Sequence, residues 1–358
     1  MSDKLLKVAD QLKKIEIQKF INELTEAIKY LAIYETKVED CRSEDGFFLP
    51  VMQRIEALSS LKIEGTQTTM NDVIADLVIP DEKNLDLLEI KNHQQALLNG
   101  VEAIKFSGFS HDIIKKIHKT MLNNVRKKNK GVLLGEYKSE DNYIVNSIGS
   151  KVFVPPKFSE TKEYMDDLIS FMNDTKYGEL HPLIRAAVMH AQFESIHPFG
   201  DGNGRVGRLL ITLFLYYHKI VESPLFYISE ALQQDKVSYY RNLTESREGD
   251  YNEWIKYFLS KCAVQAKRHI EYIDQINELY AKTDEKVSRI IKGCSKDVLR
   301  ILFNYPQINV RTLALEMNIS KQQANRYLKA LVNDKILYPD DKKRNTSYFF
   351  IELIDLIV

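Results

Sequence analysis

Twelve consecutive residues, His197 to Arg208, concentrate side chains that could act on phosphates. They read His-Pro-Phe-Gly-Asp-Gly-Asn-Gly-Arg-Val-Gly-Arg and so include one imidazole, one carboxylate, one amide and two guanidinium groups among four glycines. His197 is the only group among them that can accept a proton near neutral pH. Asp201 supplies a hard oxygen ligand of the kind that binds Mg²⁺ together with phosphates.

The flanking segments predict that this stretch is a loop between two helices. Residues 181–196 carry apolar side chains at helical spacing, with Pro182 at a favourable first position, and residues 209–217 are apolar enough for a buried helix. Glycines let several backbone N–H groups turn toward one point, and a helix start adds partial positive charge. Arg205 and Arg208, three residues apart, share a helix face. We therefore expect an anion-binding nest suited to a polyphosphate.

Other interpretations of these residues fit less well. The glycine spacing of residues 202–207 matches a dinucleotide-binding loop, but such a loop follows a strand and the preceding residues here are helical. Asp201 and Asn203 begin like a calcium-binding loop, but Arg205 stands where a third oxygen ligand belongs. The sequence has no glycine-rich loop that ends in Lys-Ser or Lys-Thr. A purely structural helix–helix turn would not explain so many functional side chains.

At every defining position the stretch resembles the signature of Fic-domain proteins, His-x-Phe-x-Asp/Glu-Gly-Asn-Gly-Arg-x-x-Arg. Members with this form of the motif usually move AMP from ATP onto a protein hydroxyl. The resemblance implies that His197 is the general base, that Asp201 holds Mg²⁺ against the α- and β-phosphates, and that Phe199 anchors the loop. It places the α-phosphate at Asn203 and the 202–204 backbone, the β-phosphate at Arg205 and the γ-phosphate at Arg208. The implied nucleotide-binding residues are Gly202, Asn203, Gly204, Arg205, Val206, Gly207 and Arg208.

A second motif lies upstream. Ser60-Leu61-Lys62-Ile63-Glu64-Gly65 resembles the inhibitory motif of the same family, Ser/Thr-x-x-x-Glu-Gly/Asn. The resemblance implies that Glu64 lies on a helix and pairs with Arg208, which would block productive binding of the γ-phosphate. Ser60 lies one helical turn earlier, and we expect its hydroxyl to hold the Glu64 carboxylate in place. An ordinary exposed Glu at a helix end capped by Gly65 is the alternative interpretation.

Residues 131–156 have the composition of a β-hairpin. Two β-favouring runs, 143–145 and 152–154, flank a polar turn. In the Fic family this region is the flap, which aligns an extended segment of the target by strand pairing. Lys138 stands where the family commonly has arginine, and lysine does not make bidentate contacts. A hairpin without target contact is the alternative.

Two tyrosines follow the motif. Residues 224–229 and the pair Tyr239-Tyr240 resemble the family's post-motif region, in which an aromatic side chain helps to close the adenine pocket. Tyr239 and Tyr240 are therefore expected to contact the nucleotide, and two core tyrosines are the alternative.

Residues 295–358 resemble a winged helix-turn-helix domain. Ser320 is expected to cap the second helix, and residues 335–351 would form the wing. If this unit binds DNA, Lys321, Gln322, Asn325 and Arg326 would enter a groove, with Lys342, Lys343 and Arg344 near phosphates. Contact with protein is the alternative, because such domains attached to enzymes often mediate protein contacts.

We therefore expect a mainly α-helical protein, with a Fic-like helical core, a β-hairpin flap and a small winged helix-turn-helix domain. The expected domains are a helical region with the inhibitory motif at 1–100, the core at 101–265, a linking helix at 266–294 and the winged helix at 295–358. The 358 residues contain 50 Lys and Arg and 50 Asp and Glu, so net charge argues for neither nucleic acid nor membrane. Three scattered cysteines and a polar N-terminus without a signal-peptide core predict a cytoplasmic protein.

The expected function is transfer of AMP from Mg-ATP onto a Ser, Thr or Tyr hydroxyl of a target protein, with self-inhibition by Glu64 on Arg208. ATP and Mg²⁺ are the expected substrate and metal. Two alternatives stay open: a DNA-binding regulator with a nucleotide-sensing core, and an enzyme that removes AMP. Self-modification and a homodimer also stay open, whereas no apolar run is long enough to span a membrane. The target protein and its modified residue do not follow from the sequence.

Overall fold

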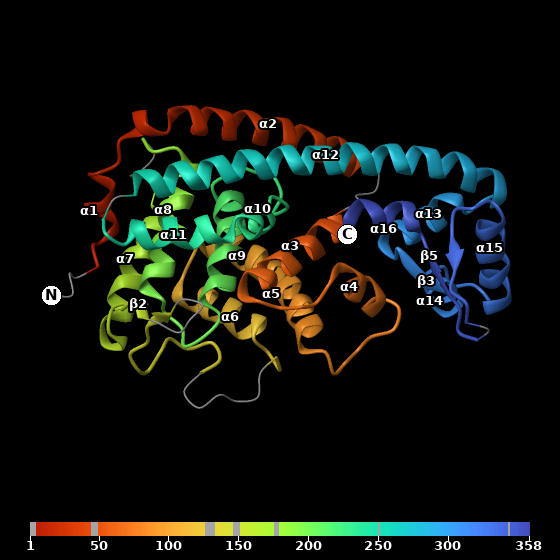
Figure 1. Ribbon diagram of the computed structural model, residues 1–358, viewed down its shortest axis with the longest axis horizontal. Helices are drawn as coiled ribbons and strands as arrows, with labels where there is room; N and C mark the ends of the chain where they lie inside the picture. Colours follow the sequence, from red (N-terminus) through yellow and green to blue (C-terminus); the bar gives the residue numbers. More distant parts are fainter. Residues whose placement is uncertain are drawn as a thin grey trace.

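The computed structural model describes residues 5–43, 49–125, 133–145, 151–174, 179–249, 251–342 and 344–358. The fold is mainly α-helical, as expected. Helices α2 and α12 lie side by side along one long edge of the molecule (Figure 1). The N-terminal part contains α1 (Val8–Leu12), η1 (Ile17–Lys19), α2 (Ile21–Ser43), α3 (Leu49–Glu64), α4 (Met70–Asp76), α5 (Leu85–Ser107) and α6 (His111–Met121).

The middle of the chain forms the hairpin and the helices that frame the motif. Its elements are β1 (Ile144–Val145), β2 (Lys151–Phe153), η2 (Phe158–Glu160), α7 (Thr161–Asn173), α8 (Pro182–Ile196), α9 (Asn203–Tyr217), α10 (Ser229–Gln234) and α11 (Lys236–Ser246). Strands β1 and β2 pair antiparallel, which confirms the expected hairpin, although residues 146–150 of its turn lie outside the described residues.

The core is centred on α8 and α9. Every residue of α8 from Leu183 to Ile196 is buried, because the helix is apolar on nearly all sides and α7, α9, α11 and α12 pack around it. Helix α9 packs against α8 and is also contacted by α3, α5 and α6. Two buried helices therefore present the loop between them, residues 197–202, from a rigid base.

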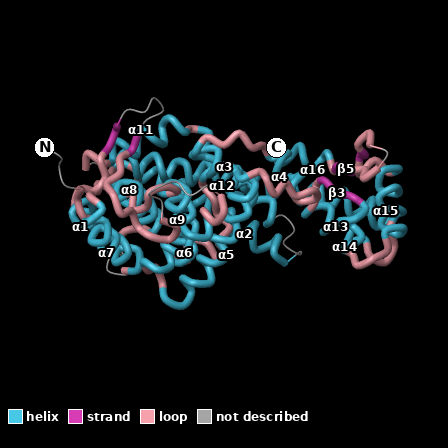
Figure 2. Tube along the Cα trace, turned by 90° about the horizontal axis from the view of Figure 1, so that it is seen from below, coloured by secondary structure: helices cyan, strands magenta, loops and turns pink. Residues whose placement is uncertain are grey.

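Helix α12 (Asn252–Ile290) spans 39 residues, or about 58 Å at 1.5 Å per residue. It runs without a break through residue 265, where the sequence places the end of the core. Beyond it lie α13 (Ser295–Asn304), β3 (Gln307–Asn309), α14 (Val310–Glu316), α15 (Lys321–Asn333), β4 (Tyr338–Pro339), β5 (Ser347–Phe349) and α16 (Ile351–Ile357). This C-terminal unit lies at the opposite end of the molecule from the β1–β2 hairpin (Figures 1 and 2).

The C-terminal unit combines its helices with a small antiparallel sheet of strand order β3-β5-β4. The Ser320 hydroxyl accepts the Gln323 N–H at 3.1 Å, which confirms the expected cap of α15. The assignment of this unit as a winged helix stays a prediction. Within the described residues, no helix has the length and apolar character needed to cross a bilayer.

Candidate active site

The loop that joins α8 to α9 depends on two residues in the left-handed region. His197 follows the last residue of α8 with φ of 48°, and Gly202 precedes α9 with φ of 79°. Glycine adopts this conformation freely, whereas a histidine there is uncommon and is held by its surroundings. The strained residue is the one expected to carry the proton chemistry, which is where backbone strain concentrates in functional sites.

The Asn203 side chain closes this loop. Its Oδ1 accepts the Phe199 N–H at 2.8 Å, and its Nδ2 donates to the Phe199 carbonyl at 2.8 Å. Both ends of the amide are thereby used within the loop, and the side chain is buried. The Asn203 side chain is therefore not available to an α-phosphate. The first backbone N–H groups of α9 are available to bind an anion, because they have no acceptor inside the helix.

Phe199 is completely buried and stacks on His118, with 3.9 Å between ring centroids. The Gly135 N–H donates to His118 Nδ1 at 3.0 Å, so the ring proton is on Nε2, which donates to the Asp201 carbonyl at 3.0 Å. Burial lowers the pKa of His118 to about 4 and keeps the ring neutral. Nothing in the local sequence around His118 indicates this contact, through which its ring supports the Asp201 backbone.

Lys138 and Asn142, which precede β1, fasten the hairpin segment to the loop. Lys138 donates from Nζ to Asn142 Oδ1 at 2.8 Å and to the Ile196 carbonyl at 3.2 Å, and Asn142 donates to the carbonyls of His197 and Phe199 at 3.1 Å each. Lys138 is buried, and burial lowers its pKa to about 8. This lysine thus binds loop carbonyls as a point donor, a role that its position in the sequence did not reveal.

His197 is neutral at physiological pH. Burial, followed by the positive charges of Arg247 and Lys138, lowers the pKa of its ring to about 4. Its Nδ1 atom is buried. A neutral imidazole beside cations can accept a proton, which is what a general base requires.

Arg208 of α9 is bonded by two residues of the predicted inhibitory motif, Ser60 and Glu64. Its Nη2 donates to Glu64 Oε1 at 2.7 Å and to the Ser60 carbonyl at 3.0 Å, and its Nε donates to Ser60 Oγ at 3.0 Å. The pair expected from the sequence is therefore present. The expected action of Ser60 is corrected: its hydroxyl accepts from Nε of the buried guanidinium and so holds the arginine rather than the Glu64 carboxylate.

The Glu64 carboxylate lies at the helix start where the sequence predicts an anion nest. A Cβ placed on Gly204 would come within 2.5 Å of Glu64 Oε1, so the carboxylate rests against the backbone of the first turn of α9. Helix α3 can end there because Gly65, with φ of 103°, lets its N–H bond the Leu61 carbonyl at 3.1 Å. Burial would raise the pKa of Glu64, but the charge of Arg208 outweighs it and lowers the pKa. The carboxylate is therefore ionised at neutral pH.

Arg205 pairs with two carboxylates. Its Nη2 lies 3.1 Å from Asp201 Oδ1, and its Nη1 forms an ion pair with Glu89 of α5. Burial lowers the pKa of Arg205 to about 10, so it stays charged at neutral pH. Glu89 lies on α5, and nothing in the local sequence pattern indicates that its side chain reaches the motif.

A metal ion fits at Asp201 only together with further oxygen ligands. Among the described residues, no group of three or more His, Cys, Asp or Glu side chains is arranged to hold a metal. Mg²⁺ is commonly held by one or two carboxylates plus substrate phosphates, and Asp201 offers one carboxylate beside the nest. The donor set thus fits a metal that arrives with a nucleotide.

The two tyrosines expected at the adenine differ in exposure. Tyr239 is buried, its hydroxyl bonds His190 Nε2 at 2.8 Å, and its ring packs near Trp254. Tyr240 is 42% exposed, and its hydroxyl bonds the Ile63 carbonyl, next to Glu64, at 3.4 Å. Of the two, only Tyr240 has a surface that a nucleotide could contact.

Val206 and Gly207 support α9 from within. Val206 is fully buried, and a Cβ on Gly207 would come within 2.4 Å of Glu194 Oε1 and 3.1 Å of the Phe193 ring. These two residues could therefore contact a nucleotide only through their backbone atoms. Gly207 lacks a side chain, which allows α8 and α9 to pack closely at this point.

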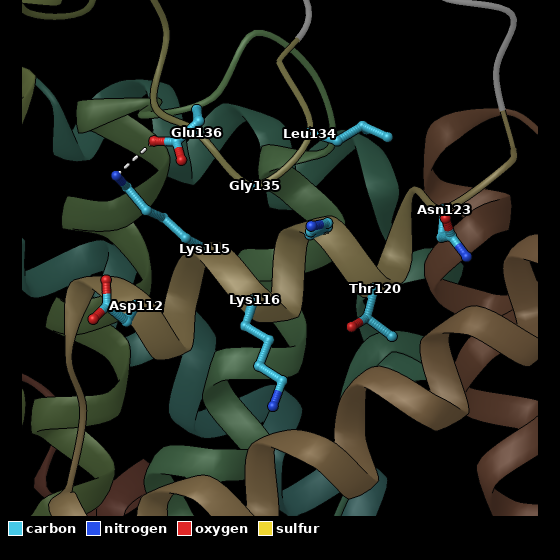
Figure 3. A pocket seen from close by; sticks show the side chains of 9 residues that line it. Asp112, Lys115, Lys116, Thr120, Asn123, Leu134, Gly135 and Glu136 are labelled. Atoms are coloured by element: carbon cyan, nitrogen blue, oxygen red, sulfur yellow. Dashed lines mark hydrogen bonds and ion pairs between the residues drawn. The ribbon is translucent and has the colours of Figure 1, made fainter.

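A separate cavity of about 630 Å³ lies on the outer side of α6 and contains none of the motif residues (Figure 3). Lys115 points to Glu136 across it, at 2.7 Å (Figure 3). The residues that line it are Asp112, Lys115, Lys116, Lys119, Thr120, Asn123, Leu134, Gly135 and Glu136.

Comparison with known proteins assigns the family. The Fic/DOC family model matches residues 108–215, and the Fic/DOC N-terminal model matches residues 21–102, which together exceed half of the chain. The chain belongs to the Fic/DOC family, as its motif indicated.

Its curated relatives include the protein adenylyltransferase Fic of Nematostella vectensis, which is 26% identical over 206 residues, or 56% of this chain and 44% of the relative. The protein adenylyltransferase fic-1 of Caenorhabditis elegans is 28% identical over 118 residues, or 33% of this chain and 22% of the relative. This chain therefore spans less than half the length of these relatives.

Solved structures share the fold. A Fic family protein from Desulfovibrio desulfuricans G20 matches with a TM-score of 0.61 at 18% identity, over 93% of this chain and 95% of that chain. A Fic domain containing signaling protein from Bacteroides thetaiotaomicron VPI-5482 matches with a TM-score of 0.55 at 22% identity, over 69% of this chain and 97% of that chain.

Proposed function

We propose that this protein is an adenylyltransferase that moves AMP from Mg-ATP onto a hydroxyl of a protein target and that Glu64 inhibits it. The observation that carries the proposal is the Glu64 carboxylate on Arg208 at the start of α9. An anion already rests where the helix start and two arginines favour negative charge. The curated relatives named as protein adenylyltransferases support the same chemistry.

The reaction follows from the groups around the loop. The target oxygen attacks the α-phosphorus of ATP while its proton passes to the neutral His197 ring. A new bond forms between that oxygen and the α-phosphorus, and the bond from the α-phosphorus to the oxygen that bridges to the β-phosphate breaks. Pyrophosphate leaves with the electron pair of the broken bond. The N–H groups at the start of α9 and the Arg205 guanidinium would stabilise the charge that develops on the phosphates.

Magnesium, when bound, neutralises phosphate charge and fixes the orientation of the phosphates. Asp201 is the residue of this chain that would hold it, and the His118 ring fixes the Asp201 carbonyl. Arg205 would contact the β-phosphate and Arg208 the γ-phosphate. Tyr240 is the aromatic residue that would border the adenine, since Tyr239 is buried in the core.

Inhibition follows from competition for Arg208. While Glu64 holds the guanidinium, a γ-phosphate has to displace a charge-assisted hydrogen bond and a carboxylate that repels it. ATP would then bind, if at all, with its phosphates displaced from the line of attack. The target is a protein with an accessible Ser, Thr or Tyr, presented along the β1–β2 hairpin by strand pairing.

The test uses the full chain with Glu64→Gly, Mg²⁺ and ATP labelled at the α-phosphate, with and without His197→Ala. We expect label on protein from the Glu64→Gly form and none from the double variant, while both bind ATP. Label that persists without His197 would exclude this residue as the base. Loss of label from a protein already modified would indicate instead that the enzyme removes AMP.

A DNA-binding regulator is the second candidate, because α15 exposes Lys321, Gln322 and Arg326 on one side of the C-terminal unit. Binding of duplex DNA that weakens steeply with salt, and that is lost in Lys321→Ala but kept in His197→Ala, would support it. DNA binding that does not depend on Lys321 would argue against α15 as the recognition helix.

A further inference from the structure

Glu89 forms a buried ion pair with the first arginine of the motif. Its side chain is 8% exposed and that of Arg205 is 3% exposed. Glu89 takes Nη1 of the guanidinium, while Asp201 takes Nη2 at 3.1 Å. Two carboxylates, one on α5 and one in the loop before α9, therefore hold one arginine from two sides.

The element that carries Glu89 is itself fixed. Asn84 caps α5 by accepting the N–H groups of Asp86 and Leu87. One turn before Glu89, the Asp86 carboxylate accepts the Thr68 hydroxyl at 3.1 Å and the Thr66 hydroxyl. The start of α5 is thus tied to the segment that follows the inhibitory helix. A side chain on so well anchored a turn can define where its partner lies.

We propose that Glu89 is a positioning residue for Arg205: it sets the guanidinium at the β-phosphate and keeps its single contact with Asp201 from becoming a bidentate pair. This inference rests on the proposed function, because it assigns Arg205 to the β-phosphate. Without an acceptor at Nη1, the planar guanidinium is free to turn and form a bidentate pair with Asp201. That pair would remove both the arginine from the phosphate and the carboxylate from the metal.

Two other roles for Glu89 give different results. As a competitor for Arg205, it would weaken nucleotide binding, and its removal by either Gln or Ala would tighten binding of ADP. If the Glu89–Arg205 pair only holds α5 to α9, its loss would lower the stability of the protein and weaken the binding of all nucleotides alike. The positioning role alone predicts an effect that needs the β-phosphate and that glutamine repairs, because its amide oxygen still accepts from Nη1.

The experiment measures binding of AMP and of ADP, each with Mg²⁺, by isothermal titration. It uses the full chain with Glu64→Gly, alone and combined with Glu89→Ala, Glu89→Gln or Glu102→Gln. Glu102 is the matched control, because it lies on the same helix, is exposed and pairs with the exposed Lys105, away from the motif. Thermal unfolding of each variant shows whether it is folded.

We expect Glu89→Ala to weaken the binding of ADP about tenfold or more, which is the size of a lost charge-assisted contact. The affinity for AMP should stay within about twofold. Glu89→Gln should recover most of the ADP affinity, and Glu102→Gln should change neither ligand. Equal changes for AMP and ADP, tighter ADP, or no change would each overturn the positioning role. If the Glu64→Gly protein itself binds ADP no better than AMP, the assignment of Arg205 in the proposed function fails, and the role of Glu89 fails with it.

Discussion

Replacement of Glu64 should release the site by an amount that the structure allows us to estimate. The carboxylate accepts one hydrogen bond from a fully buried guanidinium at 2.7 Å. A hydrogen bond to a charged group contributes about 1.5–3 kcal/mol. The Glu64 side chain is 39% exposed, so solvent screening reduces this contribution to about 1–2 kcal/mol.

At about 1.4 kcal/mol per factor of ten, this free energy corresponds to a rise of about 5- to 30-fold in the productive binding of ATP. The increase should appear in kcat/KM for label transfer, because Arg208 is then free before ATP binds. Binding of AMP, which has no γ-phosphate to reach Arg208, should change much less. The γ-phosphate dependence thus separates release of Arg208 from a general loosening of the site.

The assay compares Glu64→Gly, Glu64→Ala and Glu64→Gln with Lys62→Ala, an exposed residue of the same helix. Glycine at a helix end also weakens the helix by up to about 1 kcal/mol, whereas alanine does not, so equal gains from both would assign the effect to the carboxylate. A gain in Lys62→Ala, or none in Glu64→Ala, would refute competition for Arg208 as the mechanism. Only a gain in the glycine variant would point to fraying of α3.

Three further outcomes are expected. In the Glu64→Gly background kcat/KM should be nearly the same at pH 5.5 and 7.5, because a base with a pKa of about 4 is still about 97% neutral at pH 5.5. An ordinary histidine would lose about tenfold over this range, and such a loss would contradict the lowered pKa of His197. Asn203→Ala should lower the free energy of unfolding by about 2–4 kcal/mol in urea titrations, because the buried N–H and carbonyl of Phe199 lose their partner, and an unchanged midpoint would refute the closure of the loop by this amide. Arg54→Ala should lower the melting temperature in circular dichroism by a few degrees, because the 3.1 Å hydrogen bond from α3 to the Asn304 carbonyl is lost, whereas the exposed control Lys62→Ala should not.

The parts of the site that lie close in sequence could be predicted. The glycines and the two arginines from Gly202 to Arg208 define a helix start and an anion nest through local geometry alone. By resemblance, the Ser60–Gly65 pattern predicted that Glu64 lies on a helix and pairs with Arg208, and the ion pair is present. The hairpin around β1 and β2 was predicted from its strand-forming runs.

The contacts that hold the site in place could not be predicted, because they join residues far apart in the chain. Lys138 lies nearly sixty residues before the carbonyl that it binds, at Ile196, and Glu89 lies more than a hundred before Arg205. The sequence around His118 has an ordinary helical pattern, and only the tertiary fold brings its ring onto Phe199. A single sequence shows which residue types are available, but not which of them meet when helices pack.

One physical property accounts for both the proposed nucleotide binding and the proposed inhibition. Gly204 lacks a side chain, so an anion can lie against the first turn of α9, and Glu64 Oε1 does so. A nest of N–H groups with two arginines attracts negative charge and does not distinguish a carboxylate from a phosphate. Inhibition of this kind would need no separate binding site. It would need only a helix, such as α3, that ends with a carboxylate next to the first turn of α9. Any process that withdraws the end of α3 by a few ångströms would leave the nest to the nucleotide.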